Sequence, residues 1–230
     1  MKKALKNIDR GTAFDYADQR WIVLEHDPAG RTLCLTEKII EDRAFDDDNC
    51  NDWGKSSSRN YLNGAFLDNL IAAAGGVNPF QTVEIDLTAD DGLKDYGTTH
   101  AVIFLLTIDQ YRRNRDVIPN ADDWWWLSTA VSTASNGYEH SARFVLSGGA
   151  LRWDSAYYGG GGLRPACYLD SDLLISINED DATPERAGEI LKELAEQFGG
   201  THATEQQLTA AAAFMLGQLR AEREQEAAHE

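Results

Sequence analysis

The sequence contains few cysteines and has no long apolar run. Its three cysteines, Cys34, Cys50 and Cys167, are too few and too scattered for a disulfide framework, and none lies in a zinc-binding pattern. Cys34 and Cys167 lie in apolar strand-like stretches, so we expect reduced, buried thiols. No stretch approaches the ~18 unbroken apolar residues of a membrane span, and no apolar segment follows the N-terminal lysines as it would in a signal peptide. We therefore expect a cytoplasmic protein that does not contact membranes.

Positive charge is also scarce. The chain has 21 Lys and Arg residues against 38 Asp and Glu residues, and its formal net charge is −17. Contact with phosphates needs concentrated Lys and Arg, and the only basic runs are the N-terminal lysines and Arg112-Arg113. We therefore expect no direct binding to nucleic acid. The acidic surface fits a basic protein partner, or it only keeps the protein in solution.

The apolar pattern predicts many short strands and one longer internal helix. The helix is capped by Ser56-Ser57-Ser58 and stopped by Gly75-Gly76. Thr107 can cap a second, short helix. The first two strands form a hairpin around Asp27-Pro28-Ala29-Gly30. The expected strands cover residues 19–24, 32–36, 83–88, 124–127, 142–146, 150–153 and 163–169, and residues 101–106 suit a buried element.

The composition changes near residue 178, which divides the chain into a domain at residues 1–178 and a helical tail at residues 179–230. Thr183-Pro184-Glu185 is a good helix start, and Thr204 with Gln207 forms a capping box. Two apolar stripes predict a helical hairpin. They consist of Ala187, Ile190, Leu191, Leu194 and Phe198, and of Leu208, Ala212, Met215 and Leu219. The stripes would pack against the same chain, or against another copy in a homo-oligomer.

Patterns that carry catalysis are missing. The five histidines are isolated from one another, and residues 159–162, four glycines, lack the order of a phosphate-binding loop and are expected to form a flexible loop. The acidic run Asp46 to Asp52 offers oxygen ligands for calcium but lacks the Gly and Glu of an EF-hand loop. A solvated acidic turn is the favoured interpretation, and calcium is the alternative. We expect no enzyme activity, no metal and no cofactor.

Aromatic and small polar residues gather instead on two segments next to expected strands, residues 136–140 and 152–158. Tyr and Trp provide contact area at low entropic cost, while Ser, Gly and Asn adapt to a partner. We expect Trp153 to point inward as a strand residue, whereas Tyr157 and Tyr158 are adjacent and cannot both be buried. The candidate ligand-binding residues are Tyr138, His140, Arg152, Trp153, Asp154, Tyr157 and Tyr158.

Five blocks, in order along residues 19–170, resemble an uncharacterised domain family of bacteria and phages. The longest runs from Trp53 to Phe66 and fits the pattern W-x-x-S-x-x-R-x-x-L-N-x-x-F. Ser128 departs from the family's WWLRS block, and the tail lies outside the family pattern. The other blocks are Trp21-Ile22-Val23-Leu24, Phe104-Leu105-Leu106, Trp125-Trp126-Leu127-Ser128 and Gly162-Leu163-Arg164-Pro165-Ala166.

This family resembles the C-type-lectin fold shared by formylglycine-generating enzymes and by the variable proteins of diversity-generating retroelements. The resemblance implies an α+β, C-type-lectin-like mixed domain whose loops form a binding face, here followed by the C-terminal helical hairpin. Val77-Asn78-Pro79 does not reproduce the sugar-binding motifs, and the cysteine pair of formylglycine chemistry is missing. Residues 154–162 contain only residue types that adenine mutagenesis produces, which fits either a diversified loop or ordinary loop composition.

The sequence therefore predicts a non-enzymatic binding module of bacterial or phage origin that presents an aromatic loop surface to a protein partner. The protein would be cytoplasmic or associated with a virion. The alternative is an acidic, phage-type anti-defence inhibitor that occupies a basic nucleic-acid channel of its target.

Overall fold

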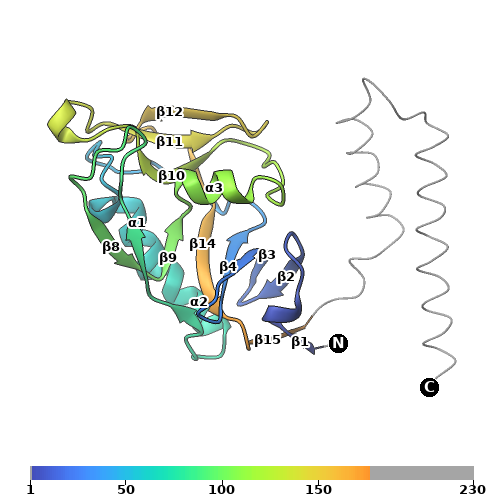
Figure 1. The fold of residues 1–230 in the computed structure, drawn as a ribbon. Coiled ribbons are helices and arrows are strands. Elements are labelled where there is room, and N and C mark those ends of the chain that lie inside the picture. The colour runs from blue at the N-terminus through green and yellow to red at the C-terminus, as the bar shows by residue number, and fades with distance from the viewer. Residues whose placement is uncertain (1, 177–230) are drawn as a thin grey trace, which may run out of the picture. The chain divides into compact units, whose positions relative to one another are not determined.

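The structure, a computed structural model, describes residues 2–176 and is built mainly from β-strands (Figure 1). Most strands are short, between two and six residues. The strands are β1 (Lys2–Ala4), β2 (Ala13–Tyr16), β3 (Gln19–His26), β4 (Arg31–Thr36), β5 (Glu41–Asp42), β6 (Phe80–Gln81), β7 (Val83–Asp86), β8 (Thr98–Ala101), β9 (Ile103–Leu105), β10 (Trp125–Ala130), β11 (Ser141–Val145), β12 (Leu151–Ser155), β13 (Gly162–Leu163), β14 (Pro165–Asp170) and β15 (Leu174–Ser176).

Two larger sheets organise these strands. A five-stranded sheet has the order β12-β11-β10-β13-β5, and a six-stranded sheet has the order β2-β3-β4-β14-β6, with β9 also paired to β14. Figure 1 shows β10, β11 and β12 together above β14, β4, β3 and β2. Two small sheets, β1-β15 and β7-β8, complete the strand pairing of the described residues. The chain passes from one large sheet to the other between β13 and β14, next to Arg164.

Helical structure is limited in the described part of the chain. The longest helical stretch covers residues 57–73 and consists of α1 (Ser57–Tyr61), a π-helical turn (Leu62–Phe66) and α2 (Leu67–Ala73). Ser56 caps it, as expected, by accepting a hydrogen bond from the Arg59 amide. The second helix, α3 (Ile108–Asn114), begins with the expected Thr107 in a capping box. The remaining helical turns are 3-10 turns at Leu5–Asn7, Trp53–Lys55 and Ala134–Asn136.

The prediction of an α+β fold class is wrong, because strands dominate the described residues. Strands such as β5, β6 and β13 have two residues each and are too short to show an alternating pattern, so the sequence underestimates the β content. The predicted C-terminal helical hairpin, the tail at residues 179–230 and the boundary at residue 178 lie outside the described residues.

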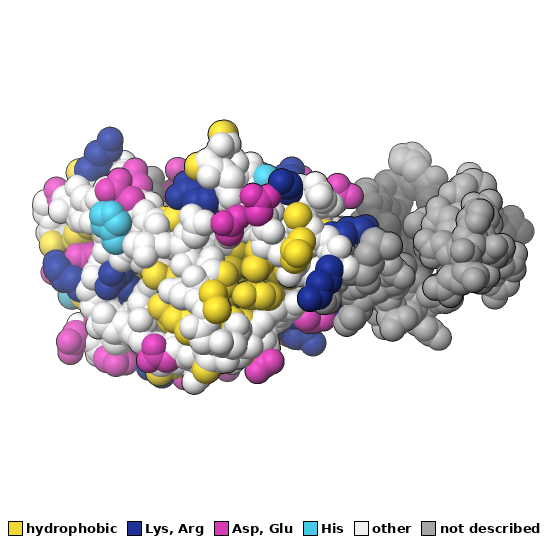
Figure 2. Space-filling model, turned by 90° about the horizontal axis from the view of Figure 1, so that it is seen from below, with side chains coloured by type: hydrophobic (Ala, Val, Ile, Leu, Met, Phe, Trp, Pro, Cys, Tyr) yellow, Lys and Arg dark blue, Asp and Glu magenta, His cyan; other side chains and the backbone are white. Residues whose placement is uncertain are grey.

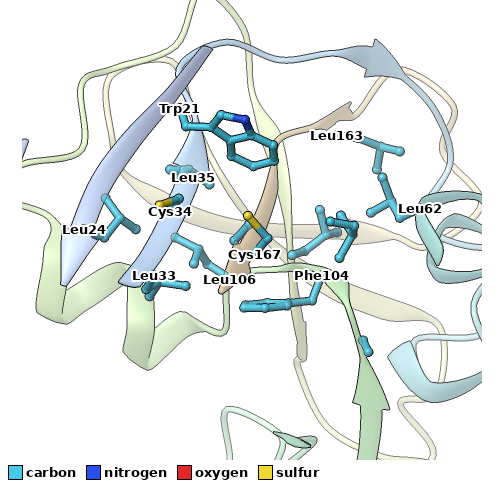
Figure 3. Close-up of a cluster of buried hydrophobic side chains, with 14 of the residues drawn as sticks. Trp21, Leu24, Leu33, Cys34, Leu35, Leu62, Phe104, Leu106, Leu163 and Cys167 are labelled. Atoms are coloured by element: carbon cyan, nitrogen blue, oxygen red, sulfur yellow. The ribbon is translucent and has the colours of Figure 1, made fainter. Parts of the chain in front are cut away.

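The core lies where β3, β4, β9 and β14 face the helical stretch at residues 57–73 (Figure 3). Trp21, Leu35 and Phe104 are fully buried there. Cys34 and Cys167 occupy opposing positions on β4 and β14, and both are free and fully buried, which confirms their predicted burial. Burial raises the pKa of both thiols, so they act as small core side chains.

Arg164 links the end of β4 to the segment that precedes β10 from inside the protein. Its side chain is fully buried and donates hydrogen bonds to the carbonyl oxygens of Thr36, Glu37 and Pro119 at 2.9 to 3.0 Å. Burial lowers the pKa of this guanidinium to about 10, which still leaves it charged at neutral pH. The arginine of the Gly162–Ala166 block therefore has a structural role.

Candidate functional site

Four of the large hydrophobic side chains that remain exposed belong to the predicted ligand-binding residues. Tyr138, Trp153, Tyr157 and Tyr158 are 58%, 58%, 59% and 51% exposed. Tyr and Trp are the residue types that most often dominate the energy of protein interfaces. The exposure of Trp153 corrects the expectation that it points inward.

Two aliphatic side chains are equally exposed but belong to another part of the surface. Val77 follows α2, and Leu174 opens β15, at 68% and 61% exposure. Both elements lie at the lower end of the molecule in Figure 1, on the side that Figure 2 views, where apolar side chains gather between charged ones. Neither residue was predicted to bind a ligand, and both lie at the end of the molecule opposite to β11 and β12, so they are not assigned to the candidate site.

The two predicted loops meet at one end of the β11–β12 hairpin. Tyr138 and His140 directly precede β11, while Tyr157 and Tyr158 directly follow β12. The amide of Ala156 donates to the His140 carbonyl oxygen at 2.7 Å and links the two loops. We call the exposed side chains of Tyr138, His140, Tyr157 and Tyr158 the loop-end surface.

A buried asparagine, Asn51, holds the first of these loops. Its side-chain amide donates to the carbonyl oxygens of Ser132, Tyr138 and Ser141 at 2.8 to 3.0 Å. Its backbone amide donates to the Glu139 carbonyl at 2.8 Å, and its side-chain oxygen accepts from the Tyr96 hydroxyl at 2.7 Å. Every polar group of this side chain is therefore engaged.

Asn49 connects the same turn to both loops. Its carbonyl oxygen lies 2.9 Å from Nδ1 of His140, and its side-chain oxygen accepts from the Tyr157 amide at 3.2 Å. Asn49 has a φ of 59°, a left-handed conformation that asparagine tolerates better than most residues. The loop-end surface thus rests on a fixed backbone support.

The acidic run that contains these asparagines forms a hydrogen-bonded turn. The two carboxylate oxygens of Asp46 accept from the amides of Asp48, Cys50 and Ser57 at 2.9 to 3.1 Å. Asp52 accepts from the Gly54 amide and pairs with Lys55 at 2.8 Å. Among residues 2–176, no group of three or more His, Cys, Asp or Glu side chains has an arrangement that could hold a metal ion.

Two further carboxylates hold the loop at residues 131–137. The hydroxyls of Ser135 and Thr133 donate to Asp95, and these bonds lower the pKa of that carboxyl. A hydrogen bond from Ser132 lowers the pKa of Asp91 in the same way. For Tyr96, which binds Asn51, burial raises the pKa of the phenol to about 12 and keeps it neutral.

A row of aromatic rings connects the surface to the core. The Tyr158 ring lies 5.8 Å from that of Trp124, which lies 4.9 Å from Trp126. Trp126 contacts Phe45 at 5.9 Å, and Phe45 contacts the buried Trp53 at 5.7 Å. Such ring pairs stabilise beyond simple burial and favour a fixed orientation.

The four glycines are not simply a flexible loop, which corrects our expectation. Gly161 is buried, and a Cβ placed on it would overlap Nε1 of Trp126. Gly162 begins β13, and its amide donates to the Trp124 carbonyl at 3.0 Å. The glycines allow the backbone to pass directly against the indole rings.

The strand register separates the other three predicted residues from the loop-end surface. On β12, Arg152 pairs with Phe144 and Asp154 pairs with Ala142, so both share the sheet face of those core side chains. Trp153 pairs with Arg143 and lies on the opposite face. The structure thus places Tyr138, His140, Tyr157 and Tyr158 on two loops that backbone hydrogen bonds join, and it places Arg152, Trp153 and Asp154 on an edge strand.

Residues that position the loops were not among the predicted site residues. Asn49 and Asn51 lie in the run that we interpreted as an acidic turn, and the two asparagines among aspartates were the only available signal. The Trp53–Phe66 block is structural: Trp53, Leu62 and Phe66 are buried. Asn63 in this block accepts from the amides of Val102 and Ile103.

A hollow in the described part of the chain is lined by residues 15–20 of the β2–β3 hairpin, and it shares no residue with the loop-end surface. In the described part of the chain, no helix has both the length and the apolar character needed to cross a bilayer.

Comparison with known proteins gives one match. Residues 83–171, from the start of β7 to just after β14, match the model of a family described as a domain of unknown function, DUF6273. This agrees with the predicted resemblance to an uncharacterised domain over that segment, but it does not confirm the C-type-lectin-like fold or the relatives we expected. A search of curated proteins and a search of solved structures found no match.

Proposed function

We propose that the protein is a non-enzymatic binding module that contacts a protein partner through the loop-end surface. The observation that carries this proposal is that three tyrosines, more than half exposed, project from loops with a fixed backbone. Exposed rings on a rigid support lose little entropy on binding, so their burial contributes most of its free energy to affinity.

The charge near the loop-end surface favours a basic partner. Asp47 and Asp48 are exposed in the turn that supports both loops, and Glu139 lies between Tyr138 and His140. The Glu139 carboxylate lies 3.7 Å from Nε2 of His140, at the loop-end surface itself. Carboxylates beside tyrosine rings suit the Lys and Arg side chains of a protein, which interact with both groups.

The second proposal, an acidic inhibitor that occupies a basic channel, is supported by the net charge of −17. The two proposals differ in their dependence on salt. Binding through dispersed charge should weaken steeply as salt rises, whereas binding through aromatic rings should change little.

The direct test compares the wild-type chain with a Tyr157→Ala, Tyr158→Ala variant. Both chains are used to capture proteins from the extract of the native host, and affinity for the captured partner is then measured by calorimetry. We expect the variant to bind at least about 30-fold more weakly, as expected when side chains that dominate an interface are removed. Tyr157→Ala alone should already weaken binding, and it leaves the contact between Tyr158 and Trp124 in place.

Val77→Ala is the matched control, because Val77 is exposed to a similar degree outside the loop-end surface. Its affinity should equal that of the wild type. Equal affinity of the double tyrosine variant, with an unchanged melting temperature, would contradict the proposed surface. An affinity that falls steeply with salt but is the same in the wild type and the tyrosine variants would favour the acidic inhibitor.

A further inference from the structure

β12 is the outer strand of the five-stranded sheet, with β11 as its neighbour among the described residues. Hydrogen bonds just beyond the two ends of β12 determine which of its backbone groups face outward. The Leu146 amide donates to the Ala150 carbonyl at 2.9 Å, and the Ala156 amide donates to the His140 carbonyl at 2.7 Å. In an antiparallel pair, bonded positions alternate with positions whose backbone groups point away. Residues 150, 152, 154 and 156 therefore bond toward β11, and residues 151, 153 and 155 face the open edge.

Side chains of β12 itself cover part of this edge. Nη1 of Arg152 donates to the Leu151 carbonyl at 3.0 Å, and Oδ1 of Asp154 accepts from the Ser155 amide at 2.7 Å. The backbone amide and carbonyl of Trp153, between them, have no partner among the described residues. Exposed edges of this kind can pair with another strand.

We propose that two copies of the chain pair through β12, antiparallel and centred on Trp153. In this register the Trp153 amide and carbonyl of each copy bond to those of the other. Leu151 and Ser155 then occupy opposing positions across the two-fold axis, as bonded pairs. The Ser155 carbonyl already accepts from the Tyr158 amide at 3.0 Å, and its second lone pair accepts from Leu151 of the other copy. The Leu151 carbonyl and the Ser155 amide, which side chains cover in one copy, become the groups that bond across the interface.

Charge complementarity supports a second copy as the occupant. Pairing about Trp153 places Arg152 opposite Asp154 of the second copy, and Asp154 opposite its Arg152. These residues fall in the non-bonded pairs of the new ladder, where side chains lie closest and opposite charges stabilise. When the strands pair, Arg152 and Asp154 lose their hydrogen bonds to the edge of their own strand, and Arg152 of each copy pairs with Asp154 of the other. The two exposed Trp153 rings lie side by side on the other face.

This dimer goes beyond the proposed function, because it uses residues separate from the loop-end surface. Tyr138, Tyr157 and Tyr158 stay outside the paired strands. Two copies would present two such surfaces in fixed relation, and this arrangement raises the apparent affinity for a partner that carries two sites.

Sedimentation velocity of the full chain, over an about hundred-fold range of concentration, tests the proposal. We expect a concentration-dependent dimer. Arg152→Asp and Asp154→Arg should each weaken dimerisation by about ten-fold or more, since like charges then oppose each other across the interface. The double variant, which exchanges the two charges, should restore dimerisation to within about three-fold of the wild type.

Trp153→Pro gives a second test. It removes an amide that faces away from β11, so the internal ladder keeps its bonds while the dimer loses its central pair. A wild-type chain that stays monomeric at every concentration would overturn the proposal. The charges of Arg152 and Asp154 would then serve to prevent pairing of this edge strand. A dimer that tolerates both single charge reversals would also overturn it and would point to the predicted tail interface. If the proline variant fails to fold, the charge exchange decides.

Discussion

Asn51 shows how a buried side chain can organise an exposed surface. It lies at 0% exposure, yet its amide holds three carbonyl oxygens of the segment that carries Tyr138. A buried carbonyl without a hydrogen bond is costly, so this side chain stabilises the loop far more than its size suggests.

Asn51→Ala should therefore lower the free energy of unfolding by about 2 to 4 kcal/mol. Denaturant unfolding measures this loss, and amide exchange should accelerate most at residues 132–141. Tyr96→Phe is the graded control, because it removes only the bond to the Asn51 side-chain oxygen and should cost about 1 kcal/mol. Unchanged exchange in the loop of the alanine variant would contradict this role.

Asp95 makes the same loop sensitive to acid. Its bonds with Ser135 and Thr133 lower the pKa of the carboxyl, so the ionised form is favoured in the folded protein. The contribution is fully present above the ordinary pKa of an aspartate, about 3.9, and is lost as the pH falls below that range and through the lowered value.

Amide exchange of residues 132–137 should therefore rise with acidification beyond the intrinsic pH dependence of exchange. In Asp95→Asn the loop should be looser already at neutral pH and should respond less to acid. An Asp95→Asn loop that still loosens strongly below pH 4 would assign the acid response to Asp91, whose pKa is lowered by Ser132.

Among the elements, the connection between β12 and β13 depends most on glycine. A Cβ placed on Gly159 would meet nothing within 4 Å, whereas the same atom on Gly161 would overlap the indole of Trp126 and lie 2.8 Å from that of Trp124. The two residues stand in one connection but differ in whether a methyl group can be accommodated.

Gly161→Ala should cost about 1 to 3 kcal/mol, because the indoles or the backbone must shift. Gly159→Ala should leave stability nearly unchanged. Thermal unfolding compares the two, and near-ultraviolet circular dichroism should report altered indole packing only for the Gly161 variant. Equal melting temperatures would show that the connection relaxes without strain.

The sequence predicted those elements whose pattern is long enough to read. The β3–β4 hairpin and the capped helix that starts at residue 57 are confirmed, since apolar runs on either side of a Pro- and Gly-containing turn mark the hairpin and capping residues mark the helix. Strands of two residues, such as β5 and β13, form because neighbouring strands supply their partners. That information is distributed over the whole chain, and the predicted fold class was wrong for this reason.

For the molecule as a whole, residue type alone indicated which loops expose aromatic rings. Residue type did not indicate which of these side chains share a surface. The register of β12 determines that Trp153 and Arg152 lie on opposite faces of the sheet. The supports Asn49 and Asn51 were missed since their role depends on contacts with residues about 80 to 110 positions further along the chain.

The position of β14 limits which fragments of this gene can be exchanged by recombination without loss of the fold. β14 lies inside the six-stranded sheet and pairs with β4 over Leu33, Cys34 and Leu35. The segment matched by the family model contains β14 but begins well after β4 has ended. A gene fragment that encoded only the matched segment would leave a buried strand without its neighbour. Recombination that preserves this fold must therefore transfer the two distant segments together.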